Sequence, residues 1–102
     1  MRSYTIRTSE QAHIDIENLH FYIVETCKSP ITSKRYIEGI YLKIKSLSHS
    51  AESYPISSLK IILQYGYNAR RINYKKMAII YTVHLRIVLI HRVIPGALIS
   101  EL

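Results

Sequence analysis

Cysteine, glycine, proline and tryptophan are scarce: the 102 residues include one cysteine, three glycines, three prolines and no tryptophan. A single cysteine excludes an internal disulfide, and no cysteines and histidines are spaced as zinc ligands. We therefore expect Cys27 to be a small buried apolar side chain. The longest apolar runs, MAIIYTV and IVLI, have the length of strands, and the N-terminus lacks the apolar segment of a secretion signal. These absences predict a cytoplasmic protein without a membrane segment, metal or cofactor.

Carboxylates are almost missing from the C-terminal half. The chain has 14 Lys and Arg against 7 Asp and Glu, a formal net charge of +7, yet no Asp or Glu lies between Ser53 and Ser100. Such a concentration of positive charge attracts polyanions or an acidic protein partner. The alternative interpretation is a basic surface that serves solubility alone. The basic residues of this segment are Lys60, Arg70, Arg71, Lys75, Lys76, Arg86 and Arg92.

Two helices are predicted in the N-terminal half, after a short strand over residues 3–7 in which apolar and polar residues alternate. Thr8 is expected to cap the first helix, and Gln11 three residues later completes a capping box. Ser29 and Pro30 predict the start of the second helix, because serine is a preferred cap and proline fits the first helical position. The helices should end near residues 28 and 48. Their short connection predicts an antiparallel hairpin.

Strands are predicted for the C-terminal half, where β-branched and aromatic residues gather in short runs separated by turns. The whole chain, residues 1–102, is then one α+β domain: an N-terminal strand, a helical hairpin and an antiparallel meander, with the helices on one face of the sheet. The order is β-α-α-β-β-β, or the same order with one more short strand. The apolar tail after Pro95-Gly96 could dock on the sheet or on another molecule. A loop is expected over residues 49–58, and strands over 59–64, 67–73, 77–83 and 87–94.

No catalytic motif is present, because the sequence lacks a glycine-rich phosphate loop, a nucleophile elbow, a zinc-protease motif and paired carboxylates. Cleavage of RNA by its own 2′-hydroxyl would need only a base, an acid and cations around the phosphate. His84 and His91 flank the last predicted hairpin, where an imidazole could transfer a proton at neutral pH. The alternative is that each is an ordinary turn or strand residue.

Tyrosines alternate with basic residues over residues 65–76. On a sheet face, this pattern could hold a nucleic-acid backbone or an acidic peptide along a strand edge. Tyr67 and Tyr81 are expected to pack in the sheet. Arg70 and Arg71 are neighbours in a predicted strand and should point to opposite faces, so one of them could be a structural arginine.

The order of these pieces resembles the RelE/ParE superfamily of bacterial type II toxins over nearly the whole chain. The resemblance rests on the first helix centred on Ala12, on SPITSKRYIEGIYLKIKSL in the second helix, on MAIIYTV, and on HRVIPGA at the end of the last strand. It implies a toxin of the plasmid-stabilisation type. In such systems a cognate antitoxin silences the toxin by wrapping a flexible segment around it.

The sequence is more similar to the ParE branch, whose members inhibit DNA gyrase without obvious catalytic residues. Ala78 stands where the RelE branch tends to place an arginine, and Ala97 and Leu98 follow Gly96 in place of the Arg, His or Tyr of the nucleases. We then expect charge reversal at Arg71 together with Arg92 to weaken toxicity or antitoxin binding and to leave the thermal transition intact. The residues expected to contact gyrase or the antitoxin are Arg70, Arg71, Lys75, Lys76 and Arg92.

The alternative within the superfamily is an enzyme, a ribosome-dependent mRNA interferase of the RelE branch. It would act on mRNA at the ribosome and would use Lys60, Arg71 and either His84 or His91. A third interpretation is a basic interaction module without toxicity. The sequence leaves open whether the chain forms a homodimer.

Overall fold

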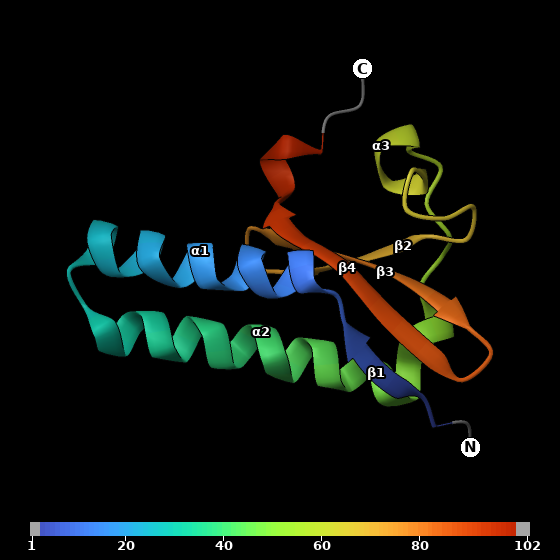
Figure 1. Ribbon diagram of the computed structural model, residues 1–102, viewed down its shortest axis with the longest axis horizontal. Coiled ribbons are helices and arrows are strands. Elements are labelled where there is room, and N and C mark those ends of the chain that lie inside the picture. The colour runs from blue at the N-terminus through green and yellow to red at the C-terminus, as the bar shows by residue number, and fades with distance from the viewer. Residues whose placement is uncertain (1–2, 100–102) are drawn as a thin grey trace.

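The computed structural model describes residues 3–99 of the chain. Its α+β fold confirms the predicted one: a strand, a helical hairpin and three further strands that join in one sheet (Figure 1). The elements are β1 (Thr5–Thr8), α1 (Glu10–Cys27), α2 (Pro30–Ser50), the 3₁₀ turn η1 (Ala51–Ser53), α3 (Lys60–Leu63), β2 (Arg70–Tyr74), β3 (Met77–His84), β4 (Ile87–Pro95) and the 3₁₀ turn η2 (Gly96–Leu98).

Serine side chains cap both helices of the hairpin. The Ser9 hydroxyl accepts a hydrogen bond from the backbone N–H of Ala12 at 3.0 Å and so satisfies a free donor at the start of α1. The prediction of Thr8 as the cap was wrong, because Thr8 is still paired with Ile90 as the last residue of β1. Ser29 caps α2 as predicted.

The strands lie in the order β1-β4-β3-β2. The last three are antiparallel, as predicted, whereas β1 runs parallel to β4. The register between β3 and β4 shifts between Ile80 and Tyr81, because His91 is an extra residue of β4 at this point. Ile90 and Val93, three residues apart on β4, consequently both belong to the core beneath the helices.

Both faces of the sheet are covered, which accounts for the burial of β3 along almost its whole length. The hairpin of α1 and α2 covers one face, where Ile16 and Ile40 pack in the same core as Tyr81. The second face carries a smaller core, in which Ile62 of α3 and Ile99 of the C-terminal segment belong with Ala78 and Ile80 of β3. Of these two layers, the helical one was predicted from the sequence; on the second face, Ile99 bears out the alternative in which the apolar tail docks on the sheet, whereas the contribution of α3 was not predicted.

One glycine allows β2 to approach α2. A Cβ atom on Gly39 would lie 1.9 Å from the hydroxyl of Tyr74. The Tyr74 ring in turn meets the Tyr36 ring edge-on, at 5.3 Å between centroids. Glycine costs a helix about 1 kcal/mol relative to alanine, and here that cost makes room for the contact between α2 and the sheet.

Residues 59–64, which were predicted as a strand, contain α3 instead. Leu59, Ile62 and Leu63 lie at the spacing of a helix face and pack on the second face of the sheet, while Ile61 is 39% exposed. Short apolar runs fit a strand and a helix equally well, so the spacing of apolar residues in the sequence could not distinguish the two structures.

Two burial predictions were also wrong. Tyr67 is 88% exposed, because β2 begins only at Arg70 and leaves Tyr67 in the preceding turn. Cys27 is exposed because it lies at the closed end of the helical hairpin, which projects beyond the sheet (Figure 1). Of the apolar tail, Ile99 is buried, and residues 100–102 lie outside the described residues.

Candidate protein-binding groove

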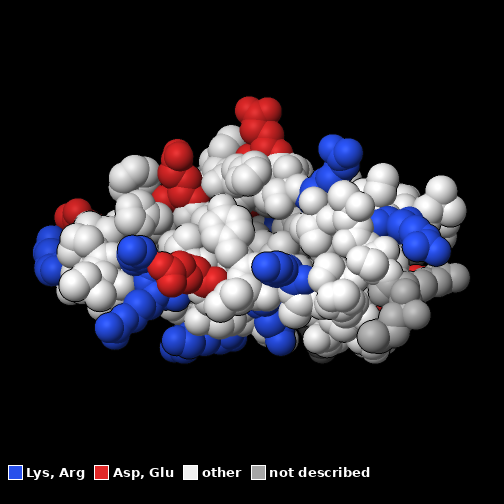
Figure 2. All heavy atoms as spheres, turned by 90° about the horizontal axis from the view of Figure 1, so that it is seen from below, with Lys and Arg blue, Asp and Glu red and all other residues white. Residues whose placement is uncertain are grey.

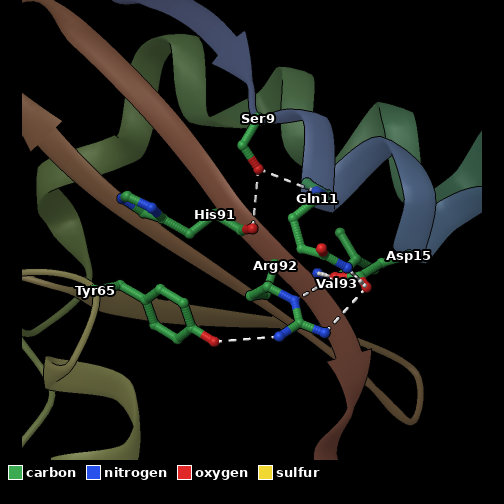
Figure 3. Close-up of polar contacts among 8 residues, drawn as sticks. Ser9, Gln11, Asp15, Tyr65, His91, Arg92 and Val93 are labelled. Atoms are coloured by element: carbon green, nitrogen blue, oxygen red, sulfur yellow. Dashed lines mark hydrogen bonds and ion pairs between the residues drawn. The ribbon is translucent and has the colours of Figure 1, made fainter.

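The second half of β4 has no strand on one side, because β1 ends at Thr8 opposite Ile90. Polar side chains of the N-cap and the first turns of α1 take the place of the missing strand (Figure 3). The Ser9 hydroxyl donates to the carbonyl of His91 at 3.0 Å, and the Asp15 carboxylate accepts from the N–H of Val93 at 3.0 Å. The first turns of α1 are thereby attached to this edge of the sheet.

Asp15 also forms a two-point ion pair with Arg92, whose Nε and Nη2 donate to the carboxylate at 2.7 and 3.1 Å. The remaining Nη1 donates to the Tyr65 hydroxyl at 3.3 Å. The Asp15 side chain is 8% exposed and that of Arg92 is 29% exposed. The hydrogen bond to Asp15 is the main reason why the pKa of Arg92 is raised. Arg92, expected to contact a partner, therefore has structural partners inside the chain.

A groove of about 570 Å³ opens beside this ion pair, between α1, the N-terminal part of α2 and the end of β4. Its walls are mainly apolar, and Tyr22 and Leu98 keep 67% and 63% of their surface exposed. Lys76 and Arg92 bring the cations of the groove, and Asp15 brings a carboxylate that Arg92 neutralises. The lining residues are Asp15, Asn18, Leu19, Tyr22, Ile23, Tyr36, Lys76, Met77, Arg92, Val93, Ile94, Pro95 and Leu98.

The β2–β3 turn places further positive charge near this groove. Lys75 has a φ of 52°, and its Nζ lies 5.3 Å from the ring centre of Tyr36 and 5.6 Å from that of Tyr74. Cation–π contacts of this kind hold an ammonium group over aromatic faces. Tyr36 also lines the groove, and its partial burial raises its pKa. The candidates Lys75 and Lys76 thus lie together near one end of the groove.

Arg70 and Arg71 point to opposite faces of the sheet, as predicted. Arg70 lies opposite Tyr81 and donates to the backbone carbonyls of Glu52 and Tyr54, so it holds the chain after α2 against the sheet. Arg71 is on the other face, where its Nε donates to the Asn73 side chain at 2.9 Å. Arg71 is therefore the neighbour that remains available to a partner.

The histidines named as nuclease candidates converge on one buried hydroxyl. The Nε2 atoms of His91 and His84 lie 2.8 and 3.0 Å from Oγ1 of Thr82, which is fully buried. A hydroxyl has one hydrogen to donate, so one of the two imidazoles must donate its own N–H. Burial, and then the proximity of His84, lowers the pKa of His91. Lys60 is exposed on α3.

Comparison with known proteins finds a solved structure that is similar to this one. No model of a protein family matches the sequence, and no curated protein matches it either. Among solved structures, a chain of the "Chromosomal ParDE TA system from P. aeruginosa" superposes with a TM-score of 0.76 and 13% identity, over 91% of this chain and 96% of that chain. This chain has the fold of that ParDE protein. The fold that the resemblance to the RelE/ParE superfamily implied is therefore confirmed.

On this ParDE fold, the groove is the feature that the sequence analysis missed. Its apolar members come from α1, α2, β3, β4 and η2, and no local pattern connects them. The nearest signal was the apolar tail, of which Leu98 lines the groove. Among residues 3–99, no helix is long and apolar enough to cross a membrane, and no three His, Cys, Asp or Glu side chains gather as metal ligands would.

Proposed function

We propose that this protein is the toxin of a type II toxin–antitoxin system, and that a cognate antitoxin silences it by occupying the groove. The observation that carries the proposal is the fold shared with a chain of a ParDE system over 91% of this sequence. The groove supports it, because apolar walls with Lys75 and Lys76 close by suit a segment whose apolar side chains are flanked by carboxylates.

A pair of matched variants tests the role of the groove. Leu98 lines it and is 63% exposed, whereas Leu42 lies on α2 outside it and is 67% exposed. We expect Leu98→Asp to weaken antitoxin binding at least about tenfold, equivalent to about 1.4 kcal/mol, and Leu42→Asp to leave it unchanged. The measurement is titration calorimetry with the product of a neighbouring gene that relieves growth arrest. Equal losses in both variants would place the antitoxin elsewhere.

We further propose that the toxin acts in the ParE manner, by binding DNA gyrase, and not as a nuclease. Two observations support this choice. His84 and His91 both direct Nε2 at Thr82, so this nitrogen of each ring is engaged inside the chain. Ala78, at the position of the RelE-branch arginine, is completely buried in the second core and brings no cation to a phosphate. Arg71, Lys75 and Lys76 are the residues we assign to target contact.

The test is plasmid supercoiling by purified gyrase with increasing amounts of the folded protein. Loss of supercoiling together with linear DNA is the expected result. Arg71→Glu should weaken the inhibition, whereas Arg86→Glu, an exposed change in the β3–β4 turn, should not. Normal supercoiling, with codon-phased cleavage of messages during growth arrest, would establish the RelE-like mRNA interferase instead.

A further inference from the structure

α1 carries a second surface, on the side opposite to its buried face. Glu10, Ile14, Glu17, Phe21 and Glu25 follow one another at steps of four, three, four and four residues, so they form one line along the helix. All five are exposed. We call this line the outer stripe.

The outer stripe combines apolar surface with unneutralised negative charge. Ile14 and Phe21 are 41% and 62% exposed. Among residues 3–99, neither Glu10 nor Glu17 pairs with a cation, and Glu25 has only the solvent-exposed Lys28, at 3.4 Å. α1 contains no Lys or Arg, although the whole chain has a formal net charge of +7. In the view of Figure 2, several carboxylates project along the upper border, whereas Lys and Arg side chains lie mainly along the lower border and at the two ends.

We propose that the outer stripe binds a basic amphipathic helix of another protein, in which apolar residues alternate with Lys or Arg at the same spacing. Ile14 and Phe21 are seven residues apart, and so are Glu10 and Glu17. A repeat of seven lets two helices pack at a shallow crossing angle, with apolar side chains in the seam and opposite charges facing each other. The stripe from Glu10 to Glu25 is about 22 Å long, which matches about four turns of a partner helix.

Charge decides against two other occupants. DNA would bring phosphates against the glutamates, which costs free energy. A second copy that paired α1 with α1 would set carboxylates of one copy against those of the other, and like charges across a helix seam are unfavourable. The proposal does not rest on the proposed function, because the stripe lies on a different side of α1 from the groove, which Leu19 and Tyr22 line.

The test uses the full chain and two designed helical peptides of three heptads. One has leucines alternating with lysines at the spacing of the stripe, and the other has glutamate in place of each lysine. Binding is followed by fluorescence anisotropy. We expect the lysine peptide to bind, with an affinity that falls as salt rises, and the glutamate peptide not to bind. Equal binding of both peptides, or binding of neither, would overturn the proposal.

Matched variants locate the contact. Phe21→Ser and Glu17→Lys should each weaken the lysine peptide at least tenfold. Leu42→Ser removes an exposed apolar side chain of α2 and Glu38→Lys makes the same charge reversal there; both should leave the affinity within twofold. Circular dichroism establishes that each variant is folded. A loss in Glu38→Lys equal to that in Glu17→Lys would show that the peptide responds to net charge alone. A dimer that Phe21→Ser dissociates in sedimentation equilibrium would assign the stripe to a second copy. Either result refutes the proposal.

Discussion

Asp15 is the residue whose replacement should most affect the attachment of α1 to the sheet. Its carboxylate accepts hydrogen bonds from Nε and Nη2 of Arg92 and from the N–H of Val93. Asp15→Ala removes both acceptor oxygens, and with them these three hydrogen bonds and one from the Gln11 side chain. Within residues 3–99, the partly buried guanidinium of Arg92 then keeps the Tyr65 hydroxyl as its hydrogen-bond partner. The variant should therefore be less stable, although the core beneath the helices keeps every apolar contact.

The expected loss follows from these contacts. Removing one member of a buried, hydrogen-bonded ion pair costs about 3–5 kcal/mol. The Arg92 side chain is 29% exposed, so water can solvate part of the stranded charge, and we expect about 3 kcal/mol. Asp15→Asn keeps an oxygen for the N–H of Val93 and should lose about half as much. For a domain of this size, about 3 kcal/mol lowers the melting temperature by about 12–24 °C.

Urea unfolding followed by circular dichroism measures these free energies. Glu17→Ala, an exposed change on the same helix, is the control and should remain within about 0.5 kcal/mol of the wild type. A double-mutant cycle with Arg92→Ala isolates the pair and should give a coupling of about 1–3 kcal/mol. A loss below about 1 kcal/mol in Asp15→Ala would refute the reasoning, because the pair would then be as weak as a surface ion pair.

The same geometry changes one expectation from the sequence. Charge reversal at Arg71 with Arg92 was expected to leave the thermal transition intact. A carboxylate at position 92 would instead face Asp15, so the thermal transition of that variant should fall. Arg71→Glu alone preserves the ion pair and is the sounder test of a contact with a target.

Three further predictions concern stability. The pKa of His91 is lowered in the folded protein, so the unfolded chain binds the proton more readily. The free energy of unfolding should therefore fall as the pH drops below about 6.5, the ordinary pKa of histidine. In urea unfolding at several pH values, His91→Gln should make the stability less dependent on pH. Gly39→Ala should destabilise the protein by about 1–3 kcal/mol, because its Cβ would overlap the Tyr74 hydroxyl. In a protein that already carries Tyr74→Ala, calorimetry should show that the same substitution costs much less. An unchanged melting temperature in Gly39→Ala would contradict the close contact. Tyr81→Phe should lose about 1 kcal/mol with the buried hydrogen bond to the carbonyl of Ala51, and a stability equal to wild type in urea unfolding would show that this bond contributes nothing net.

Local patterns predicted most of the fold. The cap at Ser29, the strands starting at Met77 and Ile87, and the order of the elements were all correct, because each follows from neighbouring residues. The errors came where packing outside the segment decided the structure. Lys60–Leu63 form a helix whose apolar side chains pack on the second face of the sheet, and Cys27 is exposed because the hairpin extends beyond the sheet.

The candidate site was less accessible to prediction. The concentration of positive charge after Ser53 is a property of composition and needs no structure. Which of the basic side chains are available does need it, because Arg70 is bound to backbone carbonyls and Arg92 to Asp15, which is 77 residues away in the chain. Neither partner has a local signal in the sequence.

The class of fold, the two helix faces and the sign of the charge on the C-terminal half follow from the amino-acid sequence alone, because periodicity, capping and charge composition are local properties of the chain. Three features depend on the folded chain: α1 completes the open edge of β4, a groove opens beside the ion pair, and two histidines meet at Thr82. The physical reason is that hydrogen-bond partners and cavities depend on which distant segments are brought together, and the chain brings them together only when the helical hairpin packs on the sheet.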